Sequence, residues 1–128
     1  MKLLLDTHTA LWLTNEYEKL SPKAKSMLDD EENALYLSIA SAWEIAIKTS
    51  IGKLNIYVGG VKAFLAKMEE LPISIFPITP RHLECVETLP LIHRDPFDRL
   101  LVATAKAEGM TILTADENIQ RYEVPSVW

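Results

Sequence analysis

Lys2-Leu3-Leu4-Leu5-Asp6 is the stretch that decides the fold: a short apolar run that ends at a carboxylate. Consecutive leucines without polar alternation are typical of a β-strand that is buried on both faces. Such a strand belongs to a parallel sheet, because the helical crossovers of a parallel sheet cover both of its sides. The first six residues therefore predict an α/β fold.

Apolar runs and helical patterns alternate along the rest of the chain. Further strands are predicted at 34–37, 74–78, 110–113 and 124–128, and helices at 7–14, from 22 onward, and at 39–49, 61–71, 80–88, 96–108 and 117–121. Ser21-Pro22 and Asp95-Pro96 each pair an N-cap residue with a proline at the first helical position. The repeated order of strand and helix predicts a central, mainly parallel sheet of four to five strands.

Length and composition point to one globular domain over residues 1–128, with 48% hydrophobic and 24% charged residues. Cys85 is the only cysteine, so no internal disulfide can form and a reducing compartment fits. Asp6 and His8 interrupt the N-terminal apolar run before it resembles a signal peptide. No later stretch is long enough to span a membrane. We therefore expect a cytoplasmic protein with no membrane partner.

The charge balance bears on nucleic-acid binding. The formal net charge is −5, with a pI of about 5.2. An acidic chain argues against an extended phosphate-binding face, which is usually basic. A cation held by carboxylates would reverse the local charge.

Four acidic residues stand where an α/β sheet places its ligands. Asp6 directly follows the first strand, and Asp116 comes shortly after the strand at 110–113. Glu44 lies in the helix after the second strand, and Asp98 in the first turn of a later helix. In open α/β sheets, ligands bind beyond the carboxyl ends of the strands. We therefore expect these four side chains to meet at one end of the sheet.

Such a cluster favours a cation. Two carboxylates about 4 Å apart repel by roughly 4 kcal/mol at an effective dielectric constant near 20. Mg²⁺ and Mn²⁺ prefer oxygen ligands, and a bound ion can activate water and offset the charge of a phosphodiester. The four acids therefore predict a divalent-metal site suited to phosphodiester hydrolysis.

Each acid also has a structural alternative. Asp6, Asp95 and Asp116 all stand where a side chain caps the helix that follows. Asp98 would interact favourably with the N-terminal end of its helix. Asp95, directly before Pro96, fits the capping role best.

Glu44 has a different alternative, an exposed ion pair with Lys48 four residues later. Its apolar neighbours Trp43 and Ile45 instead predict a buried stretch, in which a carboxylate needs a reason. We expect both Trp12 and Trp43 in the core.

Four segments together resemble PIN-domain proteins, most closely the VapC-type toxins of bacterial and archaeal toxin–antitoxin pairs. These segments are Leu3-Leu4-Leu5-Asp6-Thr7-His8, Ser41-Ala42-Trp43-Glu44-Ile45, His93-Arg94-Asp95-Pro96-Phe97-Asp98-Arg99-Leu100-Leu101 and Ile112-Leu113-Thr114-Ala115-Asp116. The resemblance covers essentially the whole chain and includes the order and spacing of the acids.

The resemblance implies a three-layer α/β/α fold and a Mg²⁺- or Mn²⁺-dependent endoribonuclease that hydrolyses RNA. It also implies a homodimer that a cognate antitoxin inhibits. Asp6, Glu44 and Asp98 fall on the three core acids of the family, and Asp116 falls on the fourth, more variable one.

Other positions match supporting members of the same site. Thr7 and Thr114 fall on small hydroxyl positions, and Asp95 and Asn118 on outer positions. Arg99 would contact RNA phosphates or pair with the acids, with solvated surface charge as its alternative.

Two other functions remain open. One is a PIN-fold RNA-processing nuclease without an antitoxin. The other is a non-catalytic α/β binding module in which the acids are only helix caps and ion pairs. A phosphatase-like site at Asp6 is disfavoured because no second acid or lysine stands beside it. A zinc site is disfavoured because His93 has no Cys or His at ligand spacing.

Overall fold

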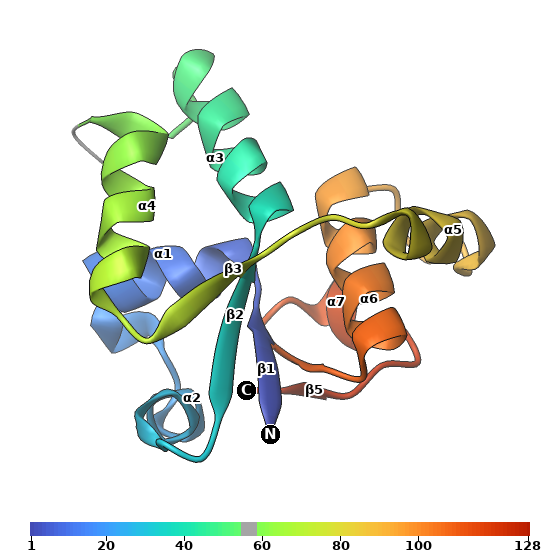
Figure 1. The fold of residues 1–128 in the computed structure, drawn as a ribbon, viewed down its shortest axis with the longest axis horizontal. Helices are drawn as coiled ribbons and strands as arrows, with labels where there is room; N and C mark the ends of the chain where they lie inside the picture. Colours follow the sequence, from blue (N-terminus) through green and yellow to red (C-terminus); the bar gives the residue numbers. More distant parts are fainter. Residues whose placement is uncertain (55–58) are drawn as a thin grey trace.

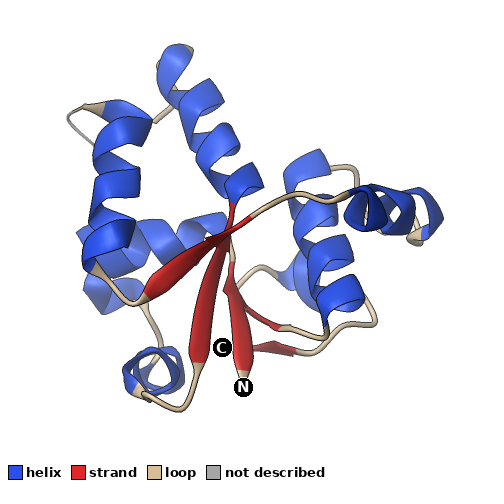
Figure 2. Cartoon of the chain, viewed as in Figure 1, coloured by secondary structure: helices blue, strands red, loops and turns tan. Residues whose placement is uncertain are grey.

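The computed structural model describes residues 1–54 and 59–128, and its centre is a five-stranded sheet (Figure 2). The strands are β1 (Lys2–Leu5), β2 (Ala34–Ser38), β3 (Ile73–Phe76), β4 (Thr111–Leu113) and β5 (Ser126–Val127). Their order is β3-β2-β1-β4-β5, and every neighbouring pair is parallel. The predicted parallel sheet is confirmed, with β1 in the middle.

Helices cover both sides of the sheet (Figure 1). The helices that precede β3 are α1 (Thr7–Asn15), α2 (Pro22–Asp29), α3 (Ile39–Ser50) and α4 (Gly60–Glu70), together with a 3-10 turn at Tyr17–Lys19. Those that follow β3 are α5 (Pro80–Thr88), α6 (Pro96–Glu108) and α7 (Glu117–Gln120). The first group lies on one side of the sheet and the second on the other, which confirms the three-layer α/β/α arrangement.

The leucine run of β1 explains why both faces are covered. Leu3 and Leu5 pack with Phe64 of α4 in one core cluster, whereas Leu4 packs with Leu101 of α6 in another. All three leucines are fully buried. Side chains alternate across a strand, so a continuous apolar run requires a helical layer on each face.

Local capping sets where the helices begin and end. The Ser21 hydroxyl accepts a hydrogen bond from the Ala24 N–H at 2.9 Å, with Pro22 at the first helical position. Helix α6 ends at Gly109, whose φ of 68° lies in the left-handed region that favours glycine. Its N–H donates to the carbonyl of Ala105. These signals can be read directly from the sequence.

Some expectations need correction. Strand β3 ends at Phe76 instead of residue 78, because Pro77 has no N–H to continue the ladder. Trp43 was expected in the core but is 58% exposed, and Trp12 is only half-buried. Among the described residues, no helix combines the length and apolar character needed to cross a membrane.

A candidate metal site at the carboxyl ends of the strands

Asp6 stands at the end of the central strand, and its carboxylate is oriented from two sides. The Thr9 N–H donates to Oδ1 at 2.7 Å, which caps α1, and the Thr114 hydroxyl donates to Oδ2. The residue is only 4% exposed. Burial raises the pKa of Asp6, against the opposing effect of the hydrogen bonds from Thr114 and Thr9. The carboxylate of Asp6 therefore has two roles: it caps helix α1, and it is a buried member of the candidate site.

Glu44 reaches the site from α3 and is also 4% exposed. The Thr7 hydroxyl donates to its Oε1 at 2.7 Å, and Lys48 Nζ binds its Oε2 at 2.7 Å. The hydrogen bond to Glu44 is the main cause of the raised pKa of Lys48. The carboxylate is therefore both buried, as its apolar neighbours predicted, and paired with Lys48, as the alternative predicted.

Asp98 lies in the first turn of α6, where the negative charges of neighbouring acids act on its carboxylate. His93 Nε2 lies 3.1 Å from its Oδ2. Burial raises the pKa of Asp98 to about 6; the hydrogen bond from His93 opposes this rise, and the charges of Asp95, Asp116 and Glu44 add to it. Acids from three separate segments therefore influence the Asp98 carboxylate electrostatically.

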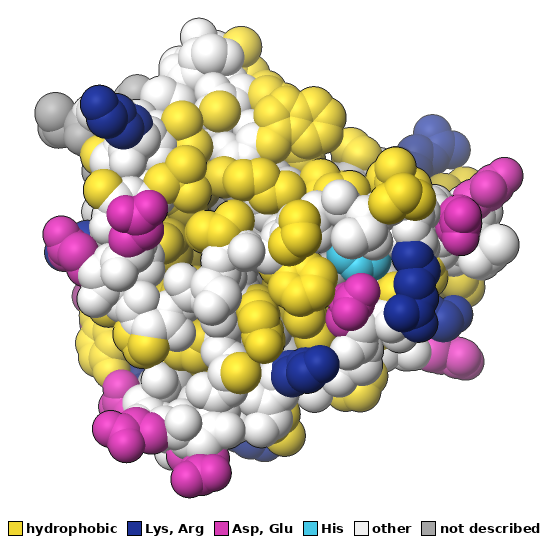
Figure 3. All heavy atoms as spheres, in the orientation of Figure 1, with side chains coloured by type: hydrophobic (Ala, Val, Ile, Leu, Met, Phe, Trp, Pro, Cys, Tyr) yellow, Lys and Arg dark blue, Asp and Glu magenta, His cyan; other side chains and the backbone are white. Residues whose placement is uncertain are grey.

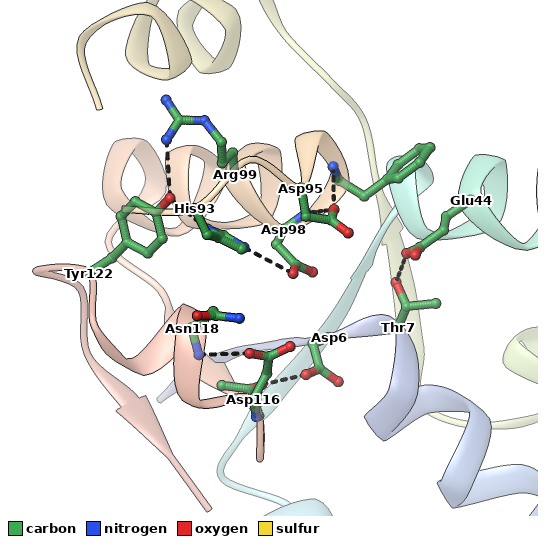
Figure 4. A network of polar contacts seen from close by, with 12 residues as sticks. Asp6, Thr7, Glu44, His93, Asp95, Asp98, Arg99, Asp116, Asn118 and Tyr122 are labelled. Carbon is green, nitrogen blue, oxygen red and sulfur yellow. Dashed lines mark hydrogen bonds and ion pairs between the residues drawn. The ribbon is translucent and has the colours of Figure 1, made fainter. Parts of the chain in front are cut away.

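Asp116 is tied to Asp6 through Thr114. The Thr114 hydroxyl, which donates to Asp6, accepts a hydrogen bond from the Asp116 N–H at 2.9 Å. Asp116 Oδ1 in turn accepts from the Asn118 N–H at 2.7 Å and caps α7. In Figure 4, Asp6, Asp98 and Asp116 surround one space, with Glu44 to one side next to Thr7.

Asp95 has the structural role that its position before Pro96 indicated. Its Oδ1 accepts from the N–H groups of Phe97 and Asp98, both at 2.9 Å. This cap orients the first turn of α6, and with it the backbone of Asp98. Asp95 thus acts on the site through the helix and through its charge.

Arg99 makes contacts that neither sequence interpretation named, and its predicted contact with RNA phosphates stays a prediction. Its Nη1 donates to the Pro90 carbonyl at 2.9 Å and to Tyr122 Oη at 3.1 Å, and its Nη2 reaches the carbonyls of Val86 and Leu89. The guanidinium therefore binds the chain at the C-terminal end of α5 instead of facing solvent or pairing with an acid. Sequence gave no signal for this, because those carbonyls come from a distant turn.

A cavity of about 260 Å³ opens beside the two lower carboxylates of Figure 4. It is lined by Asp6, His8, Trp12, Ala115 and Asp116. Trp12 is thus a wall of the site, a role that sequence reasoning missed when it placed this residue in the core.

The donor set fits a hard cation. Over residues 1–54 and 59–128, no three His, Cys, Asp or Glu side chains lie close enough together to hold one ion. The prediction that all four carboxylates bind the same ion therefore stays a prediction. Mg²⁺ commonly binds through one or two carboxylates and keeps several waters, so it does not require a closed cage. The pKa of Asp98 is raised mainly by burial and further by the charges of Asp95, Asp116 and Glu44, and a bound cation would offset both effects.

Comparison with known proteins gives one family. The sequence model of the PIN domain matches residues 3–125. Among curated proteins, the chain is similar to Ribonuclease VapC22 of Mycobacterium tuberculosis, with 28% identity over 98% of both chains.

Solved structures share the fold at low sequence identity. VapBC2 from Rickettsia felis, bound to a DNA fragment from its promoter, has a TM-score of 0.74 with 14% identity and covers 100% of this chain and 99% of its own. FitAcB from Neisseria gonorrhoeae has a TM-score of 0.65 with 17% identity and covers 98% of this chain and 96% of its own. The overall fold is therefore common to these proteins.

Proposed function

The chain belongs to the PIN domain family, and on that premise we propose that it is a divalent-metal-dependent endoribonuclease and the toxin of a toxin–antitoxin pair. The observation that carries the proposal is the gathering of buried carboxylates at the strand ends, where Asp6 is 4% exposed and the pKa of Asp98 rises to about 6. The similarity to Ribonuclease VapC22 along nearly the full length of both chains supports RNA as the substrate.

Asp6, Glu44, Asp98 and Asp116 are the proposed ligands of the ion, Mg²⁺ or Mn²⁺. As the described side chains are placed, no three of them could bind one ion together, so the ion would be held by one or two of these carboxylates and by water. When bound, it would supply an activated water and offset the charge that develops on the phosphodiester. The other residues of the site prepare these carboxylates. Thr114 aligns Asp6, and every carboxylate held by a hydrogen bond has fewer orientations to lose when a ligand binds.

Lys48 limits the negative charge around the substrate. RNA is a polyanion, and the site carries several carboxylates in a chain of net charge −5. The ammonium of Lys48 lies 2.7 Å from Glu44 and is also influenced by Asp95 and Asp98. It therefore neutralises part of the site at the edge where α3 faces α6, and it lowers the repulsion that an approaching phosphate meets.

The decisive experiment compares cleavage of a structured RNA with Mg²⁺ or Mn²⁺ and with chelator, for the wild type and Asp6→Asn. We expect the variant and the chelated enzyme to lose activity by about 100-fold or more, because the barrier reduction supplied by a metal amounts to several kcal/mol. Glu69→Gln is the matched control, since this exposed carboxylate lies on α4 away from the site. Equal cleavage by Asp6→Asn, or cleavage that survives chelation, would contradict the metal–carboxylate mechanism.

We also propose where the antitoxin binds. A second hollow of about 530 Å³ lies at the opposite end of the sheet, with an apolar floor that includes Leu13, Leu28 and Leu71. Its rim carries acidic residues, among them Asp30 and Glu31. Figure 3 shows acidic side chains on this lower face, around α2. An apolar segment with basic flanks is complementary to such a surface.

The antitoxin surface is tested with the protein encoded beside this chain. Glu31 is exposed. Glu31→Lys should weaken the affinity for the antitoxin in calorimetry, and the loss of affinity should be larger at low salt than at high salt. Glu69→Lys, the same change on α4, should leave affinity unchanged. Equal weakening by both variants would indicate only a general effect of net charge, and would argue against this hollow as the binding surface.

A further inference from the structure

A chain of hydrogen bonds connects the end of α5 to the carboxylate of Asp98 (Figure 4). Arg99 Nη1 lies 3.1 Å from Tyr122 Oη, Tyr122 Oη lies 2.8 Å from His93 Nδ1, and His93 Nε2 lies 3.1 Å from Asp98 Oδ2. His93 comes from a loop, Asp98 and Arg99 from adjacent positions near the start of α6, and Tyr122 from the segment after α7. All the distances are within normal hydrogen-bond range.

The direction of the protons follows from the chemistry of each group. A guanidinium can only donate, so Arg99 leaves the Tyr122 oxygen as an acceptor and its hydroxyl proton free for His93. An ionised Asp98 can only accept, so the facing Nε2 of His93 must carry a proton. The two ends together favour the arrangement in which Nε2 donates to Asp98 and Nδ1 accepts from Tyr122.

Tyr122 and Arg99, at the end of the hydrogen-bond chain away from Asp98, are held in place by several contacts. Tyr122 is 4% exposed, and its ring packs edge-on against His93 with centroids 5.4 Å apart. Arg99 is fixed by the backbone carbonyls of Pro90, Val86 and Leu89 in addition to Tyr122. A donor held in this way restricts the rotation of the Asp98 carboxylate, whose side chain is otherwise 21% exposed.

We propose that Tyr122 and His93, supported by Arg99, are positioning residues that hold His93 in the Nε2–H tautomer and orient Asp98 to bind a divalent cation. The part that concerns the cation rests on the proposed function, whereas the tautomer is a property of the metal-free protein. Partners in this outer position orient metal-binding side chains, and their loss typically weakens metal affinity or activity about 10–100-fold.

The tautomer is tested first, without metal. Nitrogen chemical shifts of the imidazole at pH 8 should show His93 as Nε2–H in the wild type, with the signal assigned from its absence in His93→Gln. Tyr122→Phe removes only the hydroxyl. Asp98 still accepts from Nε2–H, so the Nδ1 signal should lose the change in chemical shift that the hydrogen bond from Tyr122 causes. Tyr17→Phe, at an exposed tyrosine, is the control and should change nothing. A wild type in which Nδ1 carries the proton and Nε2 does not would overturn the proposal.

The effect on the cation is measured by Mn²⁺ calorimetry. Tyr122→Phe and His93→Leu should weaken Mn²⁺ binding by about 10-fold or more. His93→Gln can still donate its amide N–H to Asp98 and should stay within about 3-fold of the wild type, since the donor that orients the carboxylate is kept. If glutamine and leucine weaken binding equally, or if neither does, His93 is not a positioning residue.

The outcomes separate this inference from the function it rests on. A wild type that binds no Mn²⁺ contradicts the proposed metal site, while the tautomer measurement still decides the hydrogen-bond chain. A wild type that binds Mn²⁺ as tightly as Tyr122→Phe contradicts only the positioning role. Thermal unfolding in chelator, measured for each variant, shows that a loss of binding is not a loss of fold.

Discussion

The burial of the Asp98 carboxylate, together with the charges of the neighbouring acids, predicts that Asp98→Asn stabilises the metal-free protein. A carboxyl whose pKa rises from its ordinary 3.8 to about 6 destabilises the folded state by about 3 kcal/mol when ionised. Part of this is lost in the variant, because a negative charge in the first turn of α6 is itself favourable by about 0.3–1 kcal/mol. The side chain is also 21% exposed, so water screens some of the repulsion. We expect a net gain of about 1–2 kcal/mol at pH 7.5.

Thermal unfolding in chelator measures this gain. In a domain of this size each kcal/mol corresponds to about 3–5 °C, so the Tm should rise by about 3–10 °C. Asparagine keeps an oxygen that can accept the proton of His93, so the variant removes the charge and little else. Asp29→Asn, an acid of α2 at the other end of the sheet, should show no comparable gain.

At acidic pH, Asp98→Asn should no longer be more stable than the wild type. The folded protein holds the proton of Asp98 more tightly than the unfolded chain does, so wild-type stability increases as the pH falls from about 7 toward 4. The raised pKa of Asp6 acts in the same direction. Below pH 5 the wild type is largely protonated at Asp98, and the two Tm values should converge.

In the presence of divalent metal, the wild type should be more stable than Asp98→Asn. A ligand present at 100 times its Kd stabilises the folded state by about 2.7 kcal/mol, and only the wild type has the full set of carboxylates to bind it. An Asp98→Asn protein that is no more stable than the wild type in chelator at pH 7.5 would refute the reasoning. A gain that is the same at pH 5 and pH 7.5 would show that charge is not its cause.

Three further predictions follow from individual contacts. Thr114→Val removes the hydroxyl that aligns Asp6 and should lower the free energy of unfolding in urea by about 1–3 kcal/mol while weakening Mn²⁺ binding, whereas Thr114→Ser should preserve both. His82→Leu removes a fully buried ring that binds Glu108 at 3.0 Å; it should cost about 1–3 kcal/mol but leave Mn²⁺ affinity unchanged, and an altered affinity would mean that α5 is coupled to the site. The resemblance implies a homodimer, and we propose that the indole of Trp43, which is 58% exposed, lies at its interface. Trp43→Ser should lower stability by about 0.5–1.5 kcal/mol, because it removes the ring contact with Phe97, and should convert the dimer to monomer in light scattering; a dimer that persists would place the interface elsewhere.

The sheet and its acids were predictable because local patterns determine them. The leucine run of β1 could be satisfied only with helices on both sides, and Ser21-Pro22 and Asp95-Pro96 marked two helix starts correctly. Gly109 marked the end of α6. Each of these signals depends on neighbours within a few residues, and the tertiary structure did not override them.

The environment of the acids was decided by the tertiary structure. Sequence presented capping and ligand binding as alternatives for Asp6, and the structure shows a single carboxylate that caps α1 while it lies buried among site residues. Burial and ion pairing were likewise alternatives for Glu44, and both hold. Alternatives that exclude each other in a linear sequence can coexist because the two oxygens of a carboxylate accept bonds independently.

By itself, then, the sequence determined the α/β architecture, most helix boundaries and the position of Asp6, Asp98 and Asp116 at a strand or helix end, since periodicity and capping act over short distances. Only the tertiary structure decided that Trp43 faces outward and that Arg99 binds the end of α5. It also brought Tyr122 to His93, 29 residues away, and so completed the contacts that hold Asp98. Such contacts join distant segments, and no spacing in the chain records them because they depend on how the packed layers bring those segments together.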